Sequence, residues 1–304
     1  MRLAIPEKNE HDLYFRMSDL AAFSKLLYAM KEINHVLRIN FTPDGLYLSE
    51  FAANRNVLLF CSFKASDFIK YECSGPGFIA VNCGHFYKVL QNHHQKDELA
   101  LTYKCPSANQ KKREELRFEI IKESCVRKKE EEDDEDGTNW HQKSEYTIPI
   151  YVADKEMYES KVENVDLAAI ISMNTFHHFV SSIKDIEIDG GDSSGQVNLF
   201  VSNEEVTLEK RAGSLLSQCR LTLLTSKGKQ KKRDLSKRSI APDSIRKTFW
   251  MRHLVETLKF FDISSQDATV VVYIKVDPPN FPVIFEVSVG AIGQLRIAFS
   301  PAEE

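Results

Sequence analysis

A run of basic residues at positions 227–238 is the clearest candidate for chemistry in this chain. The run, KGKQKKRDLSKR, sets seven lysines and arginines, among them Lys229, Lys231, Lys232 and Arg233, against one aspartate. Clustered cations bind nucleic-acid phosphates and release condensed counterions as they do so. Three interpretations fit the run: an arm that grips nucleic acid, a nuclear-import signal, or a solvated loop with neither role.

An acidic tract stands against the basic run. Residues 130–136 (EEEDDED) carry seven negative charges, and removing them changes the formal net charge of −4 to about +3 for the rest of the chain. The tract fits three roles, which the sequence leaves open: it repels anions, contacts a basic partner, or shields the basic run.

Histidines, cysteines and carboxylates give little sign of a metal centre or an active site. The histidines near two predicted helices are His85, His93, His94, His177 and His178. They lack carboxylates or cysteines at ligand spacing, and the six cysteines form no CxxC pair, so we expect no metal. No phosphate-binding glycine loop, HExxH, GxSxG or DFG-like pattern occurs, so we expect neither an enzyme nor a cofactor. An acidic group at 187–192 fits a metal-dependent nuclease weakly and an acidic turn more simply.

Composition predicts a soluble globular protein with room for two cores. Of the 304 residues, 42% are hydrophobic and 28% are charged. No apolar run reaches the roughly 18 to 20 residues of a membrane span, and the first residues lack the apolar segment of a secretory signal. We therefore expect a cytosolic or nuclear location.

Four amphipathic helices are predicted to position the candidate side chains. They cover residues 18–33, 82–93, 174–186 and 251–261. In the first helix, apolar residues recur at the three-and-four spacing of one helical face, and Ser18 is the predicted N-cap. The opposite face shows Lys25, Tyr28 and Lys31. Such lysines occur in any soluble protein, so periodicity alone assigns them no ligand.

Strand-like runs surround the helices and repeat in the same order in both halves of the chain. They cover 11–17, 35–41, 45–51, 57–63, 78–82, 99–104, 116–122 and 144–151, then 167–173, 196–201, 206–210, 215–224, 239–250, 268–276, 283–289 and 294–299. Residues 64–71 are predicted as a short turn or helix, and 123–143 as a charged, solvated insert. We predict an internal duplication: domains at 1–151 and 167–304, joined by an extended connector at 152–166.

Several stretches resemble the sliding clamp of eukaryotes and archaea, the proliferating cell nuclear antigen family. Residues 35–73 follow that family's order of strand, turn, strand, exposed loop and strand, and end in a Phe-x-x-Tyr-x-Cys-like segment. Residues 78–91 (FIAVNCGHFYKVLQ) are similar to its strand and Asn-led second helix. Residues 248–261 and 268–304 resemble its closing part, including a Gly-x-Leu and a proline before an acidic end.

The resemblance implies an α+β protein with the DNA-clamp fold. Each of two similar domains would place antiparallel sheets outside and two helices inside, and the subunits would assemble into a ring, usually a homotrimer. The helices would line a hole around double-stranded DNA. The implied function is that of a polymerase processivity factor, with DNA polymerase, other replication or repair proteins and a clamp loader as partners. The implied location is the nucleus or a viral replication site.

The resemblance also assigns residues to DNA contact and to peptide docking. Basic residues of the channel correspond by position to Lys25, Lys31, Lys88, Arg252 and Lys259, with His178 in place of another. Gln91 and Ser181 stand where a basic residue is expected, so DNA binding should be weaker and more sensitive to salt and pH. The predicted pocket for the apolar plug of partner peptides comprises Phe51, Arg55, Asn56, Leu58, Val152, Met157, Pro282, Ala298, Phe299 and Pro301.

Two other binding functions stay open at this stage. One is a subunit of a heterotrimeric checkpoint clamp, which would not assemble with itself. The other is a viral processivity factor that binds DNA through basic loops such as 227–238 without closing a ring. The added loops and the departures from the cellular pattern favour a large DNA virus or a divergent protist as the source.

Overall fold

The computed structural model of the chain describes twelve segments. They are residues 12–52, 56–93, 97–104, 115–122, 143–151, 167–188, 195–201, 206–212, 215–223, 245–264, 267–275 and 280–302. The acidic tract 130–136, the basic run 227–238 and the predicted connector 152–166 therefore lie outside the described residues.

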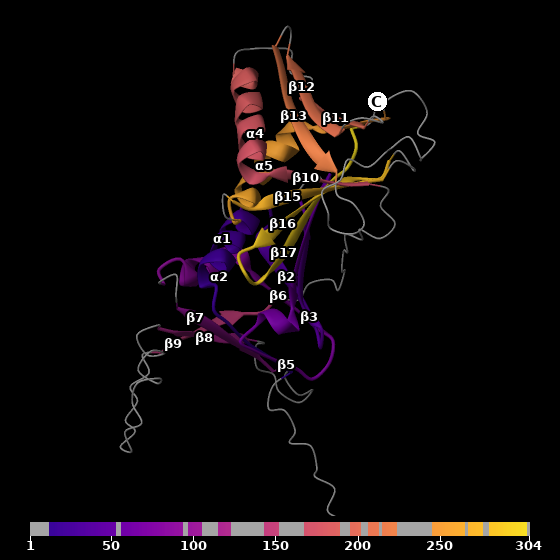
Figure 1. Ribbon diagram of the computed structural model, residues 1–304. Coiled ribbons are helices and arrows are strands. Elements are labelled where there is room, and N and C mark those ends of the chain that lie inside the picture. Colours follow the sequence, from indigo (N-terminus) through magenta and orange to yellow (C-terminus); the bar gives the residue numbers. More distant parts are fainter. Residues whose placement is uncertain are drawn as a thin grey trace, which may run out of the picture. The chain divides into compact units, whose positions relative to one another are not determined.

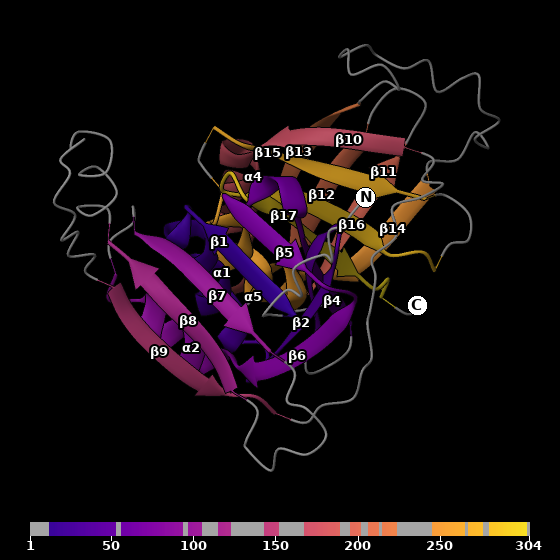
Figure 2. The ribbon, with the colours of Figure 1, turned by 90° about the horizontal axis from the view of Figure 1, so that it is seen from below.

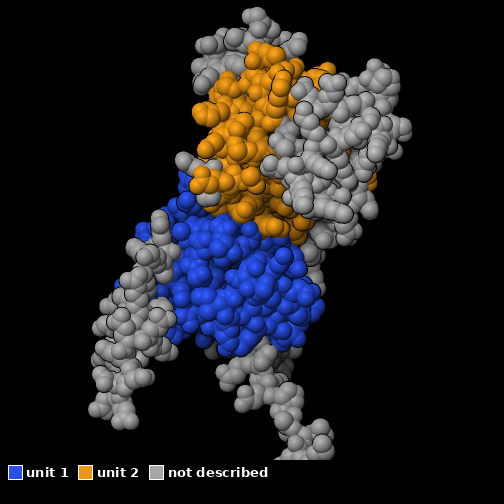
Figure 3. Space-filling view, in the orientation of Figure 1, with its two compact units in different colours: residues 1–50, 61–157, 289–293 blue, residues 51–60, 158–288, 294–304 orange. Residues whose placement is uncertain are grey.

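The chain divides into two compact units (Figure 3). Unit 1 comprises residues 1–50, 61–157 and 289–293, and unit 2 comprises 51–60, 158–288 and 294–304. The sequence predicted two continuous halves. In the structure each unit also takes one short segment from the other half, because strands β3, β4, β16 and β17 each cross the division.

Unit 1 contains a five-stranded antiparallel sheet in the order β5-β1-β7-β8-β9, whose strands run side by side in Figure 2. The bounds are β1 Leu13–Met17, β5 Lys70–Cys73, β7 Glu98–Tyr103, β8 Glu115–Ile121 and β9 Lys143–Pro149. A second set of strands runs in the order β6-β2-β3-β4. Its bounds are β2 Val36–Thr42, β3 Gly45–Phe51, β4 Val57–Lys64 and β6 Gly77–Asn82.

Two helices of unit 1, α1 (Leu20–Lys31) and α2 (Cys83–Leu90), pack against each other and against this core. The Phe23 ring of α1 meets the Phe63 and Phe86 rings edge-on, with centroids 6.0 and 5.8 Å apart. Edge-to-face pairs of this kind add to the stabilisation from apolar burial. The apolar face predicted for the first helix is the face that it buries.

The N-cap of α1 differs from the prediction. Asp19, not Ser18, caps the helix, because it directly precedes Leu20 and its Oδ1 accepts a hydrogen bond from the Ala22 backbone N–H at 3.0 Å. Asn82 caps α2 in the same way by accepting from the His85 N–H at 2.8 Å. Both helices are shorter than the predicted ranges, as helix ends fray.

Unit 2 contains one run of antiparallel strands in the order β14-β11-β12-β13-β10-β15-β16-β17. The bounds are β10 Leu167–Ser172, β11 Gln196–Val201, β12 Val206–Ala212, β13 Leu215–Leu223, β14 Ile245–Trp250, β15 Thr269–Ile274, β16 Val283–Val289 and β17 Gly293–Phe299. Helices α4 (Met173–Ile188) and α5 (Met251–Phe261) lie side by side (Figure 1). The rings of Phe176, Phe261 and Phe285 form part of the core beneath them.

The two units repeat one plan of strand, helix, strands, helix and strands, as the sequence predicted. The exception is β5, a short strand that the sequence did not predict. In unit 1, β5 pairs with β1, whereas in unit 2 the end of the longer strand β13 pairs with β10 at the corresponding place. The predicted turn or helix at 64–71 is a short 3-10 helix, Ala65–Asp67, that leads into β5.

Gly45 fixes the predicted turn between β2 and β3. Its φ is 150°, and a Cβ placed there would lie 2.0 Å from the Phe63 carbonyl oxygen. No other residue type fits so close an approach of two strands. Among the described helices, none is long and apolar enough to cross a membrane.

Candidate nucleic-acid interface

Helices α1 and α2 of unit 1 present basic side chains on the sides that they do not bury. Lys25 on α1 and Lys88 on α2 are exposed, and Lys31 at the end of α1 is half-buried. Within the described part of the chain, neither Lys25 nor Lys88 forms an ion pair. Their charges are thus available to an external anion such as a phosphate.

Two tyrosines join the exposed sides of these helices. The Tyr28 and Tyr87 rings lie 5.3 Å apart between centroids, at 51° to each other. The Lys31 Nζ lies 4.6 Å from the Tyr28 centroid and 4.5 Å from the Tyr87 centroid, which is a cation–π geometry. The same Nζ is 3.7 Å from Glu32 Oε1. Sequence patterns placed Tyr28 on the polar face but gave no sign of its contact with Tyr87.

Unit 2 carries a second basic group on its own helices. Arg252 and His178 are exposed and Lys259 is half-buried. Arg252 and Lys259 are seven residues apart on α5, two turns along the same side. The Arg252 guanidinium carbon lies 5.6 Å from the Trp250 ring centroid. Neighbouring His177 Nε2 lies 3.4 Å from Asp262 Oδ1.

Most of the positions predicted for peptide docking that the structure describes are partly exposed. Phe51, Asn56, Leu58, Pro282 and Pro301 are half-buried, and Ala298 is buried. The Asn56 carbonyl accepts from the Ser300 N–H at 2.9 Å, which brings the start of β4 beside the end of β17 within unit 2.

Phe299 belongs to the core of unit 2. Its ring stacks on Phe249 and meets Phe285 edge-on, in each case with centroids 5.3 Å apart, and none of it is exposed. A docked peptide would meet the surface that this ring supports. The remaining predicted positions, Arg55, Val152 and Met157 for the peptide and Lys229, Lys231, Lys232 and Arg233 for DNA, lie outside the described residues.

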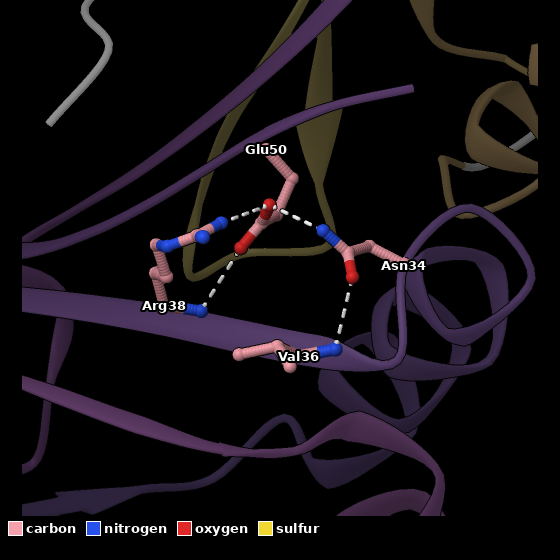
Figure 4. A network of polar contacts seen from close by, with 4 residues as sticks. All are labelled: Asn34, Val36, Arg38 and Glu50. Carbon is pink, nitrogen blue, oxygen red and sulfur yellow. Dashed lines mark hydrogen bonds and ion pairs between the residues drawn. The ribbon is translucent and has the colours of Figure 1, made fainter. Parts of the chain in front are cut away.

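Arg38 and Glu50 form an ion pair inside unit 1 that holds strands together (Figure 4). Glu50 on β3 accepts from Arg38 Nη1 at 2.7 Å and from Asn34 Nδ2 at 2.8 Å, and its other oxygen accepts from the Arg38 N–H at 3.2 Å. Asn34 Oδ1 in turn accepts from the Val36 N–H. Burial raises the pKa of Glu50, although the neighbouring Arg38 lowers it. The network links the segment that follows α1, through Asn34, to strands β2 and β3.

Other features of the described residues offer no catalytic constellation. A hollow of about 410 Å³ opens on the β7, β8 and β9 strands. It is lined by Thr102, Arg117, Phe118, Glu119, Glu145, Tyr146 and Thr147. No group of three or more histidine, cysteine or acidic side chains within the described segments has the arrangement of a metal site.

Comparison with solved structures identifies the fold. The chain matches the crystal structure of a PCNA2–PCNA3 complex from Sulfolobus tokodaii with a TM-score of 0.64 and 17% identity, covering 96% of this chain and 100% of that one. The chain has a PCNA-like clamp fold. No family model and no curated protein matches the sequence.

The clamp fold accounts for the repeated plan of the two units. Each unit has mostly antiparallel strands and, among its described residues, two helices, so the predicted fold class is confirmed. At 17% identity the likeness lies in the backbone arrangement. The residue assignments to DNA and peptide stay predictions.

Proposed function

We propose that this chain is a subunit of a DNA sliding clamp, a processivity factor that encircles double-stranded DNA and tethers replication and repair enzymes. The observation that carries the proposal is the match of 96% of the chain to a clamp fold. The protein would act by staying threaded on DNA, without catalysing a reaction. DNA polymerase and other enzymes would dock through short peptides at the positions predicted from the resemblance.

The exposed basic side chains support a sliding contact with DNA. Lys25, Lys88 and Arg252 project from helices, and each can neutralise a phosphate. Phosphate contacts carry no sequence information, so they hold a duplex while permitting movement along it. The basic run 227–238 would add a further, salt-sensitive contact.

Two strand edges support assembly into a ring. Among the described strands, β9 pairs along its length only with β8. Residues 215–221 of β13 pair with β12, and only the last two residues of β13 pair with β10, so most of one side of β13 has no paired neighbour within the described segments. We infer that β9 of one subunit pairs with β13 of the next. Such a heterologous contact covers both edges and closes a ring when the rotation permits.

A hetero-oligomer is the second candidate. The matched structure is a complex of two different proteins, PCNA2 and PCNA3, so the partner at each edge of this chain can be a different clamp subunit. A homotrimer is the simpler assembly and the one that we propose first. Nuclear or viral replication sites are the proposed location, since both hold the duplex DNA that the ring would encircle.

Light scattering coupled to size-exclusion chromatography tests the assembly. A homotrimer has a mass of three times 34.8 kDa. A monomer at every concentration would overturn the homotrimer and leave the hetero-oligomer. Retention on closed circular DNA, with release when the circle is cut, tests encirclement directly. Equal retention on circular and linear DNA would contradict threading.

A further inference from the structure

We propose that Tyr28, Lys31 and Tyr87 form a binding site for single-stranded DNA on the α1–α2 surface of unit 1. The aromatic rings would stack on unpaired bases, and Lys31 would bind the adjoining phosphate. This inference rests on the proposed function in one respect, namely that the surface meets DNA. It adds a ligand that sliding on a duplex does not require.

Tyr28 is held in place by its neighbours and is still accessible to a ligand. Tyr28 is 46% exposed, although its ring centroid lies 5.3 Å from that of Tyr87 and the Lys31 cation lies over it. A tyrosine placed only to fill the core would be covered by its neighbours. Here the contacts fix the orientation of the ring while nearly half of the residue remains accessible. A ring held this way can receive a flat partner with little further ordering.

Basic side chains accompany the two tyrosine rings on α1 and α2. Lys31 Nζ lies within 4.6 Å of both ring centroids and 3.7 Å from the Glu32 carboxylate. Exposed Lys25 lies one turn before Tyr28, and exposed Lys88 follows Tyr87 directly. Lys31 is thus the cation in contact with both rings, and two further exposed cations lie on the same two helices. This combination of basic side chains and aromatic rings is typical of surfaces that bind single strands.

The preference for single strands follows from the geometry of DNA. In a duplex the base faces are stacked on one another, so the tyrosines could reach only the sugar-phosphate backbone. In a single strand each base offers a π-face, and stacking on an aromatic side chain strengthens binding in a sequence-tolerant way. The site would therefore engage an unpaired stretch, as occurs at a gap or at a junction between single-stranded and duplex DNA.

Fluorescence anisotropy with the full-length protein tests the site, using labelled oligothymidylate and a blunt duplex of equal length. We expect Tyr28→Ala and Tyr87→Ala each to weaken binding of the single strand about tenfold and to leave duplex binding within about twofold. Tyr28→Phe keeps the ring and should bind like the unaltered protein. Lys31→Ala should weaken both ligands and lower the slope of log affinity against log salt by about one.

Tyr151 supplies the matched control. It is 41% exposed, comparable to Tyr28, but it follows β9 and lies outside the helices. Tyr151→Ala should leave both affinities unchanged. Thermal unfolding of each variant checks that the fold is intact. If Tyr28→Phe loses binding as Tyr28→Ala does, the contact is made by the hydroxyl and the stacking site is overturned.

The outcomes separate this site from the clamp proposal. Unchanged single-strand binding in Tyr28→Ala and Tyr87→Ala, or an equal loss for single strand and duplex, overturns the stacking site and leaves encirclement standing. Failure to be retained on circular DNA overturns encirclement. Tyrosine-dependent binding of oligothymidylate would still support the site in that case.

Discussion

The Arg38 guanidinium and the Glu50 carboxylate form a hydrogen-bonded ion pair inside unit 1, with Nη1 2.7 Å from Oε2. Glu50 is 2% exposed, so its charge depends on Arg38 and Asn34 for compensation. A buried ion pair contributes little net stability, but removing one partner leaves an uncompensated charge. The pair therefore makes a test of unit 1 that is independent of DNA.

Replacing Arg38 by Met should lower the free energy of unfolding by about 3 kcal/mol at neutral pH. Burial raises the pKa of Glu50 above its ordinary value of 4.5. A raised pKa in the folded state means that stability is fully present below pH 4.5 and is lost as the pH rises through the folded-state pKa. The penalty in Arg38→Met should hence shrink as the pH falls. Urea unfolding at several pH values measures this loss of unfolding free energy. Arg117 is exposed, so the control variant Arg117→Met should change the free energy of unfolding little at any pH.

His93 should make the folding stability depend on pH in the opposite direction to Glu50. Its Nε2 lies 3.1 Å from Tyr146 Oη on β9, and its Nδ1 lies 3.9 Å from Asp97 Oδ2. Burial lowers the pKa of His93 below 6.5, Asp97 opposes this shift, and Lys122 adds to it. Stability should thus be complete above pH 6.5 and fall as the pH drops through the lowered pKa.

Replacing His93 by Gln should remove this part of the pH dependence, because the amide does not titrate. Chemical unfolding at intervals below pH 7 measures the difference. His85 on α2 is exposed, and His85→Gln is the matched control. In this variant the slope of unfolding free energy against pH should equal that of the unaltered protein. An unchanged slope in His93→Gln would show that another group titrates in this range.

Strong local patterns made much of the fold predictable from sequence. Helix α5 has the predicted bounds, 251–261, because its apolar spacing begins and ends sharply. Strand β5 escaped prediction because KYEC is short and none of its residues is buried. Ser18 and Asp19 are both good N-caps, so the sequence could not choose between them until the helix start was known.

The candidate site was only half predictable. Lys25 and Lys88 follow from the polar faces of helices and from resemblance. The approach of Tyr87 to Tyr28 depends on how α1 packs against α2, 59 residues apart in sequence, and no local pattern reports such a contact. The exchange of 51–60 and 289–293 between the units likewise depends on strands pairing over long separations.

The proposed DNA contacts predict a change in salt dependence. Replacing Lys25, Lys88 and Arg252 together by Ala should lower the slope of log affinity against log salt by about three, because each cation contacts one phosphate. Titration of a short duplex at several salt concentrations measures the slope. A control of equal charge change, Lys64, Lys104 and Arg117 to Ala, removes exposed cations from strands and strand ends. Equal slopes in the two triple variants would contradict the helical interface.

The proposed ring predicts that one leucine on β13 controls assembly. Leu216 is 46% exposed, and on the side of β13 away from β12 its position has no paired neighbour among the described residues. Burial of this side chain against β9 of the next subunit would stabilise the ring, and an aspartate there would bring an unpaired charge into the contact. Leu216→Asp should therefore convert the trimer to a monomer that retains its thermal stability.

Ile69, which is 51% exposed and lies outside strands β9 and β13, is the matched control. Light scattering should give the trimer mass for Ile69→Asp. A trimer in Leu216→Asp would place the subunit contact elsewhere, since a charge cannot be buried at a subunit interface without loss of affinity.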